Sequence, residues 1–351
     1  MKISATYVSH PLVFFRSAGT SRGILHQKAC WYILLKGEDG RSGLGEVSFI
    51  PGLSVEDADE IEIQIDHVCK LINRGEMDPG GKLPALPGLQ FALETALLDL
   101  KQGGSGLLFP SDFTRGMAGI STNGLIWMGD PAHMKRQIGE KLEQGFRVLK
   151  MKVGALELET ELKILHDIRE EHDPGELEIR LDANGAWSAE EAFGKLEKFA
   201  SFGIHSIEQP IAPGQNETMA ELCTSEIIPI ALDEELIGIS SSHQRAELLG
   251  SIRPAYIILK PGLLGGFRIA QEWIRLAGDF NTGWWITSAL ESAVGLNAIA
   301  QWTYSLDVSI PQGLGLGTLY SNNIPSPLEM RKDRLWYRPE KQWDYDLIPG
   351  M

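Results

Sequence analysis

The chain has 351 residues, 43% of them hydrophobic and 23% charged, which excludes a disordered or fibrous protein and leaves room for one large domain and a smaller one. Thirty-two basic against 47 acidic side chains give a net charge of −15, so we expect neither nucleic acid nor a membrane surface as a partner. Only three cysteines occur and none forms a CxxC pair, which favours a reducing, cytoplasmic compartment. The N-terminus lacks a signal-peptide core, and no uncharged run reaches the roughly 20 apolar residues of a spanning helix.

Residues 1–105 predict a small α+β domain. Short β-rich runs separated by Gly- and Asp-containing turns are followed by segments with apolar residues at three- and four-residue spacing. We expect strands over Ile3–Val8, Cys30–Leu35 and Gly43–Val47, and helices over Val55–Ile72, with Ser54 as its N-cap, and Phe91–Lys101.

Residues 106–314 alternate β-rich runs with amphipathic helices, each pair taking about 25 to 30 residues. Because parallel strands joined by right-handed crossovers close readily into a barrel, this repeat indicates an α/β fold of the TIM type, a (β/α)7β barrel. We expect residues 315–351, rich in Gly and Pro, to fold back as irregular structure near the smaller domain. The predicted barrel strands are Ala118–Ser121, Phe146–Val153, Leu177–Leu181, His205–Glu208, Ile227–Leu232, Tyr256–Leu259 and Trp284–Thr287. The predicted helices between them begin near Pro131, Leu156, Ser188, Glu217, Ser241, Gly265 and Ser292.

Charged residues stand where these strands end, and in parallel barrels this is the edge that carries the chemistry. In chain order they are Lys150 and Lys152, Asp182, Glu208, Asp233 and Lys260. A single Asp there is usually a helix cap and a single Lys is usually solvated, but a charge at five successive strand ends favours a functional site. Three converging carboxylates need a cation, and all-oxygen ligation favours Mg²⁺ above Mn²⁺ or Ca²⁺.

The lysines have a role beside such a metal. Lys152 lies next to Lys150 and near the cation, which favours its neutral amine form and makes it a competent general base. Lys260, four strands further on, approaches from the opposite side of the barrel mouth. The site therefore suits removal of a proton α to a carboxylate, with the negative charge of the enediolate held by the metal and a lysine.

Five short motifs resemble those of the enolase superfamily, and within it those of the muconate-lactonizing subgroup. The resemblance extends over nearly the whole chain. The motifs are Lys150-Met-Lys152, Asp182-Ala-Asn184, Ile207-Glu208-Gln209-Pro210, Leu232-Asp233-Glu234 and Leu259-Lys260-Pro261. The resemblance implies a barrel with an N-terminal capping domain whose loop near residues 14–24 closes over the substrate. It also implies Asp182, Glu208 and Asp233 as ligands of Mg²⁺, with Mn²⁺ as a possible substitute, and an enediolate mechanism served by the lysines.

Within the subgroup, the segment from Thr287 to Leu296 resembles the seventh-strand segment of a menaquinone-pathway dehydratase. This implies loss of water from a cyclohexadiene carboxylate, so the expected partner is a small-molecule carboxylate. By the same resemblance Lys152 moves the protons and Lys260 stabilises the enediolate as a cation. Small residues would leave room for the ring and its side chain, and the expected substrate contacts are Ser288, Ala289, Ser292, Gly262 and Leu263.

Other activities stay open. An N-acylamino-acid racemase or dipeptide epimerase would use Lys152 and Lys260 as opposed bases, although residues 312–317 lack the Asp-x-Asp that dipeptide epimerases usually carry near the eighth strand. A lactonising cycloisomerase is a further option. A Schiff-base aldolase could place a lysine on the sixth strand but needs no carboxylate trio, and a catalytically silent binding barrel would not need all six charges. The sequence does not fix the oligomeric state.

Overall fold

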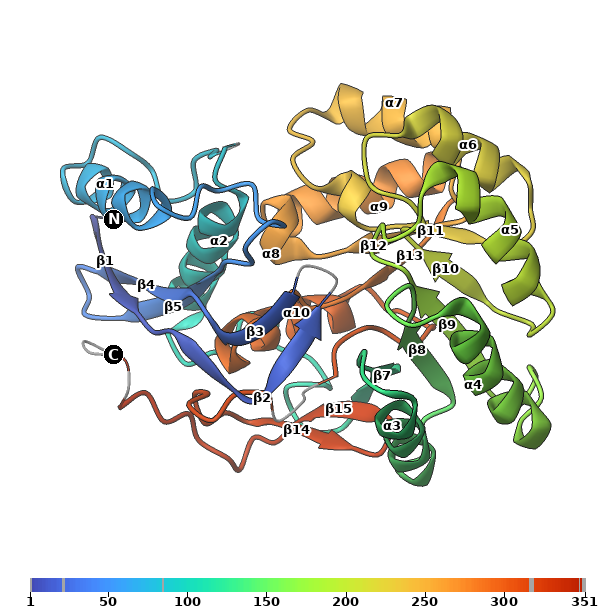
Figure 1. Cartoon of the computed structure of the whole chain (residues 1–351). Helices are drawn as coiled ribbons and strands as arrows, with labels where there is room; N and C mark the ends of the chain where they lie inside the picture. The colour runs from blue at the N-terminus through green and yellow to red at the C-terminus, as the bar shows by residue number, and fades with distance from the viewer. Residues whose placement is uncertain (1, 21–22, 84, 316–318, 347, 349–351) are drawn as a thin grey trace.

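The structure, a computed structural model, describes residues 2–20, 23–83, 85–315, 319–346 and 348. Its N-terminal part, which we call the cap, packs beside a larger barrel, and the C-terminal segment runs back along the cap (Figure 1). The cap consists of β1 (Ile3–Ser9), β2 (Leu12–Thr20), β3 (Gly23–Lys28), β4 (Cys30–Gly37), β5 (Ser42–Ser48), α1 (Ile61–Asn73) and α2 (Pro87–Gln102).

Strands β1, β4 and β5 form an antiparallel sheet in the order β1-β4-β5, and α1 and α2 bury their apolar faces on it. Helix α2 lies directly on the backbone of β5. A Cβ on Gly43 would stand 2.1 Å from the carbonyl oxygen of Ala96, and one on Gly45 would stand 1.9 Å from that of Ala92. Both positions therefore require glycine, because any side chain would push the helix off the sheet.

Two features of the cap differ from the sequence predictions. Helix α1 begins at Ile61 rather than Val55, because Ser54 accepts a hydrogen bond from the Ile50 amide and closes a loop instead of capping a helix. The loop expected near residues 14–24 is in fact largely the antiparallel hairpin β2–β3, with residues 21 and 22 outside the described part of the chain. Its closure over a substrate stays a prediction.

The barrel confirms the predicted fold class. Seven parallel strands lie in sequence order, and Gln312 and Gly313 bridge Thr287 on one side and Thr122 on the other, so they act as the eighth strand. The strands are β7 (Gly124–Ile126), β8 (Val148–Lys152), β9 (Glu178–Asp182), β10 (Ser206–Glu208), β11 (Ile230–Leu232), β12 (Tyr256–Leu259) and β13 (Gly283–Ile286). The helices are α3 (Pro131–Glu143), α4 (Leu158–Glu171), α5 (Ala189–Ala200), α6 (Asn216–Thr224), α7 (Ser242–Ile252), α8 (Pro261–Leu264), α9 (Phe267–Asp279) and α10 (Ala293–Ser305).

The first barrel strand was predicted wrongly. The run Ala118–Ser121 contains β6 (Gly119–Ser121), which pairs with β15 (Arg334–Tyr337) and not with the barrel sheet. Strand β15 in turn pairs with β14 (Leu328–Arg331), so the tail contains an antiparallel hairpin where we expected only irregular structure. The barrel sheet begins at β7.

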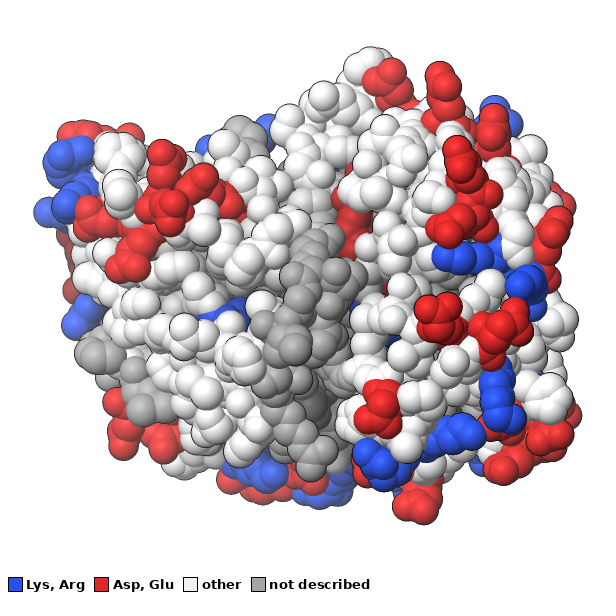
Figure 2. Space-filling view, viewed as in Figure 1, with Lys and Arg blue, Asp and Glu red and all other residues white. Residues whose placement is uncertain are grey.

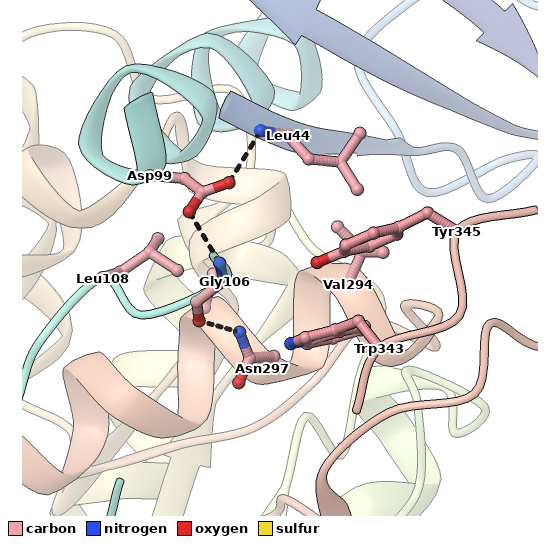
Figure 3. A pocket seen from close by; sticks show the side chains of 9 residues that line it. Leu44, Asp99, Gly106, Leu108, Val294, Asn297, Trp343 and Tyr345 are labelled. Carbon is pink, nitrogen blue, oxygen red and sulfur yellow. Dashed lines mark hydrogen bonds between the residues drawn. The ribbon is translucent and has the colours of Figure 1, made fainter. Parts of the chain in front are cut away.

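Buried polar contacts join the cap to the barrel. Figure 3 shows the Asp99 carboxylate of α2 accepting hydrogen bonds from the amides of Leu44, at 3.0 Å, and Gly106, at 2.8 Å. The Gly106 carbonyl accepts from the Asn297 side chain of α10 at 2.9 Å, and the stacked rings of Trp343 and Tyr345 line the same pocket.

Charged side chains gather over the α1 end of the cap and over the outer helices of the barrel, and the described residues between these regions show few charged side chains on this face (Figure 2). None of the described helices is both long and apolar enough to cross a membrane.

Candidate active site

The six predicted charges meet at the carboxyl end of the barrel strands. Lys150 and Lys152 lie two residues apart on β8 and so point to the same face. Both ammonium groups contact Asp182 Oδ2 at the end of β9, at 2.8 Å from Lys150 and 2.6 Å from Lys152. Lys150 also pairs with Glu208 at the end of β10.

Lys260 approaches from the far side of this group. It follows β12 and pairs with Asp233, which follows β11. The Asp182, Glu208 and Asp233 carboxyl groups are at most 2% exposed, and each is paired with a lysine, Lys150 and Lys152 on one side and Lys260 on the other. In this lysine-paired arrangement their oxygens do not all lie within 4.8 Å of one another.

Two further polar residues, Asn184 and Glu234, were not predicted to act here. Asn184 Oδ1 accepts a hydrogen bond from Lys152 Nζ at 2.5 Å, and Asn184 Nδ2 donates to Glu234 Oε1 at 3.0 Å. Both lie one or two residues beyond a predicted metal ligand, within the motifs Asp182-Ala-Asn184 and Leu232-Asp233-Glu234. Their proximity to those ligands was the available signal.

Gln209 fixes the turn that carries Asp233. Its backbone has a φ of 41°, a strained left-handed conformation for a residue other than glycine, and its side chain is fully buried. The Gln209 Oε1 atom accepts from the amides of Asp233, at 3.2 Å, and Glu235, at 3.3 Å, while Nε2 donates to Glu235 Oε2 at 2.9 Å. These side-chain hydrogen bonds thus stabilise the strained backbone conformation of Gln209.

The charged groups in this cluster shift one another's pKa values. Burial alone would lower the pKa of Lys150, but the carboxylates of Asp182 and Glu208 outweigh it and raise that pKa. Burial opposes ionisation of Asp182 as well, yet the two β8 lysines hold its pKa well below its usual range. The pKa of Glu208 is raised, first by burial and then by the neighbouring Asp182 charge.

The donor set fits a hard divalent cation. Glu208 Oε1 is buried and has no hydrogen-bond partner among the described residues, and such an orphaned carboxylate oxygen is available as a ligand. The surrounding donors are carboxylate oxygens, the type that Mg²⁺ and Mn²⁺ prefer.

The predicted substrate contacts lie beside the cluster, beneath the cap. Ala289 and Leu263 are buried in an apolar group with Ile50 of the cap, and Ser288 is half-buried after the end of β13. A Cβ on buried Gly262 would come 2.7 Å from Glu291 Oε1.

Ser292 has a structural task that we did not predict. Its hydroxyl caps α10 by accepting from the Val294 amide at 3.1 Å and donates to Glu46 Oε2 at 2.6 Å. Its contact with a substrate stays a prediction.

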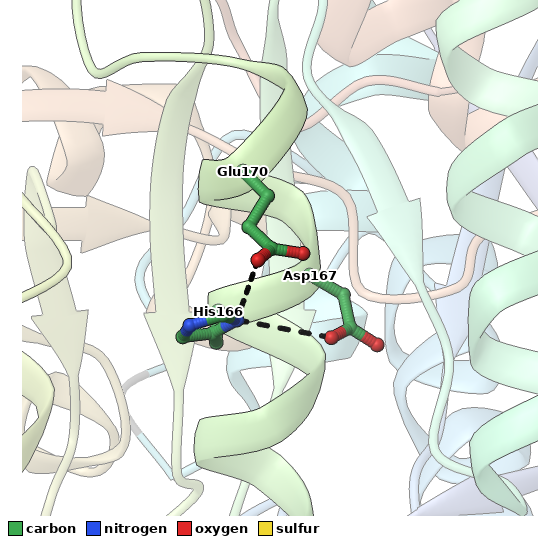
Figure 4. A group of neighbouring side chains, drawn as sticks. All are labelled: His166, Asp167 and Glu170. Carbon is green, nitrogen blue, oxygen red and sulfur yellow. Dashed lines mark ion pairs between the residues drawn. The ribbon is translucent and has the colours of Figure 1, made fainter.

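Among the described residues, the group whose potential ligand atoms all lie within 4.8 Å of one another is instead on the exposed face of α4 (Figure 4). His166 Nδ1 stands 3.9 Å from both Asp167 Oδ1 and Glu170 Oε1. Asp167 already pairs with Lys135 at 2.5 Å and with Lys163 at 3.7 Å. A solvated ion-pair network accounts for this group, and we assign no metal to it.

The fold and the carboxylate–lysine cluster define a class of barrel enzyme. Residues 133–332 match the family described as enolase C-terminal domain-like, and the chain belongs to this family. A curated o-succinylbenzoate synthase from Desulfotalea psychrophila is 47% identical over 92% of this chain and 96% of that protein. The crystal structure of MenC from Desulfotalea psychrophila has a TM-score of 0.85 at 41% identity, covering 96% of this chain and all of that one.

More distant relatives share the fold. A muconate cycloisomerase from Acinetobacter lwoffii is 30% identical over 75% of this chain and 71% of that protein. The L-Ala-D/L-Glu epimerase of Bacillus subtilis superposes with a TM-score of 0.81 at 21% identity, covering 98% of each chain, which shows common architecture alone.

Proposed function

We propose that this chain is an o-succinylbenzoate synthase. It would catalyse the Mg²⁺-dependent loss of water from 2-succinyl-6-hydroxy-2,4-cyclohexadiene-1-carboxylate, a step of menaquinone biosynthesis. The observation that carries the proposal is a buried carboxylate trio with a lysine from β8 on one side and a lysine after β12 on the other. The 47% identity to an o-succinylbenzoate synthase over most of both chains supports the choice of reaction.

Asp182, Glu208 and Asp233 would hold the divalent cation, with Mn²⁺ as a possible substitute for Mg²⁺. A bound divalent cation supplies positive charge that stabilises an enediolate formed from the ring carboxylate. Lys150, held between Asp182 and Glu208, would keep these two ligands in place.

Lys152 would perform both proton transfers. Its neutral amine takes the proton from the carbon α to the carboxylate, and the electron pair of the broken C–H bond moves into the carboxylate as an enediolate. The resulting ammonium then gives that proton to the departing hydroxyl group, which leaves as water as the electron pair returns to complete the aromatic ring. Asp182 and Asn184 orient the Lys152 nitrogen for both steps.

Lys260 would not move a proton. From its place opposite Lys152 it would put a fixed ammonium next to the developing negative charge, which is the arrangement that stabilises such a charge. The three cysteines are free thiols, which is consistent with action in the reducing cytoplasm.

Proton NMR in D₂O tests the proposal directly. Purified protein with Mg²⁺ and the cyclohexadiene substrate should produce the aromatic signals of o-succinylbenzoate. The same protein with N-succinyl amino acids serves as the comparison. Fast α-proton exchange of those amino acids without aromatisation of the diene would replace the proposal with an N-acylamino-acid racemase.

A further inference from the structure

Lys28, at the end of β3, is a buried cation without a counter-ion. Its side chain is only 1% exposed, and its ammonium group donates a hydrogen bond to the hydroxyl of Ser48 on β5. Among the described residues no carboxylate oxygen comes within ion-pairing distance of it. Lysine is almost never fully buried unless it is paired, because an isolated ammonium loses its hydration without compensation.

The surroundings of Lys28 lead to the active site. The Ser48 hydroxyl, which accepts from Lys28, also lies 3.3 Å from the Ala289 carbonyl oxygen in the loop after β13. The Ala289 amide donates to Glu291 Oε2 at 2.6 Å, and Glu291 Oε1 faces Gly262, two residues beyond Lys260. A series of contacts therefore links the cap lysine to the segment that follows the barrel lysine.

Glu291, on the barrel side of this series of contacts, has a polar atom without a hydrogen-bond partner in the described part of the chain. Its Oε1 atom is buried and has no hydrogen-bond partner among the described residues. Burial, reinforced by the nearby Glu46 carboxylate, raises the pKa of Glu291 to about 7, although the charge of Lys28 opposes part of this rise. A protonated Glu291 would not repel an anion bound between Lys28 and the barrel and could donate a hydrogen bond to it.

We propose that Lys28 binds a second carboxylate of the substrate, at the end of the side chain remote from the metal site, and so makes the enzyme selective for dicarboxylates. The inference rests on the proposed function, whose substrate carries such a second carboxylate. The unpaired ammonium on the cap and the orphaned oxygen of Glu291 on the barrel mark the two sides of the subsite. Binding would supply the counter-ion that the described residues do not give Lys28, and it would tie the cap to the barrel through the substrate.

The test compares two ligands that differ only in that carboxylate. They are o-succinylbenzoate and 2-butanoylbenzoate, whose binding to the Mg²⁺-loaded protein is measured by calorimetry. The wild type should prefer o-succinylbenzoate by about 10- to 100-fold, the range of one charge-assisted hydrogen bond. Lys28→Met should lose this preference while its affinity for 2-butanoylbenzoate stays unchanged, and Lys28→Arg should keep part of it.

Lys36→Met is the matched control, because it removes the same charge from an exposed position on the neighbouring strand β4 and should leave both affinities unchanged. An equal loss for both ligands in Lys28→Met, or no loss, overturns the proposal. Should Lys28→Met fail to fold, Lys28→Gln keeps a donor to Ser48 without the charge and must show the same selective loss. A wild type that neither dehydrates the diene nor binds either ligand would show that the proposed function itself fails.

Discussion

Asn184 is the residue that joins the acid–base lysine to the far side of the site. Its φ of 47° is left-handed, a conformation that asparagine tolerates better than most residues because its short side chain can hydrogen-bond locally. From there it touches both Lys152 and Glu234. The Asn184 side chain, just beyond the end of β9, thus orients the Lys152 amine, and the Asn184 backbone adopts the left-handed conformation that this position requires.

We expect Asn184→Gly to lower kcat by about 10- to 100-fold, the usual cost of removing a residue that orients a catalytic group. Glycine keeps the left-handed backbone, so the loss reports the side chain alone. Asn281→Gly is the control, because Asn281 is also left-handed, with a φ of 55°, but is exposed and precedes β13, at the end of the strand opposite to the site. Equal steady-state rates for Asn184→Gly and the wild type would remove Asn184 from the mechanism.

The two central lysines should respond differently to substitution. Lys152→Ala should abolish dehydration, because it removes the only group assigned to move protons. Lys260→Arg keeps a cation that does not readily act as a base, so it should retain measurable activity. Both rates are read from the aromatic product signals, and an equal loss in the two variants would instead indicate a mechanism with two bases.

The charged rim residues could be predicted from the sequence because each follows a short β-rich run and the runs recur at a regular interval. Lys28, Glu46 and Glu291 could not be found in this way. Their importance comes from contacts between segments far apart in sequence, such as Glu46 with Ser292, and no local pattern encodes such a contact.

At the scale of elements, the cap uses two carboxylates to dock on helix N-termini of the barrel. Glu46 of β5 accepts from the amides of Ser292 and Gly295, both at 2.8 Å, at the start of α10. Glu94 of α2 accepts from the amides of Phe267, at 2.7 Å, and Arg268, at 3.2 Å, at the start of α9. Each carboxylate meets unpaired N–H groups and the positive end of a helix dipole.

We expect Glu46→Gln to reduce the free energy of unfolding by about 2 kcal/mol, because the amide group turns a donor toward the Ser292 hydroxyl and the Gly295 amide. Urea denaturation followed by circular dichroism measures the change. Glu247→Gln, on the exposed face of α7, should be neutral. Unchanged stability in Glu46→Gln would mean that this buried carboxylate contributes nothing to docking.

The elements themselves were predicted unevenly, for reasons that are physical. Helices α3–α7, α9 and α10 begin within two residues of the predicted starts, and Ser188, Ser241 and Ser292 are true N-caps with side-chain hydrogen bonds. The short helix α8 was not predicted. Strand β6 was misplaced because it and β7 are both short, and only pairing with distant β15 decides which of them enters the barrel.

At the scale of the whole molecule, the bound cation should stabilise the fold. The chain carries a charge of −15, and three of its carboxylates share one buried site. A ligand that binds only the folded state at a hundredfold excess over its Kd adds about 2.7 kcal/mol. We therefore expect Mg²⁺ to raise the midpoint of thermal unfolding, and EDTA to lower it and abolish activity.

Glu208→Gln should lose most of this Mg²⁺-induced shift, because it removes a charged ligand. Asp167→Asn, in the exposed group on α4, should keep the shift intact. Differential scanning fluorimetry measures both variants. Full activity after EDTA treatment and dialysis would contradict the metal assignment.

The two-residue eighth strand also sets the order in which the molecule is assembled on the ribosome. Gln312 and Gly313 complete the ring between Thr122 and Thr287, so the barrel cannot close until synthesis has passed residue 313. The cap, although made before the barrel, buries Phe14 and Tyr32 in one cluster with Tyr320 and Ile348, which follow the barrel in the sequence. The newly synthesised cap strands therefore expose apolar surface until the later segments are made. During this interval a chain of this kind depends most on chaperones.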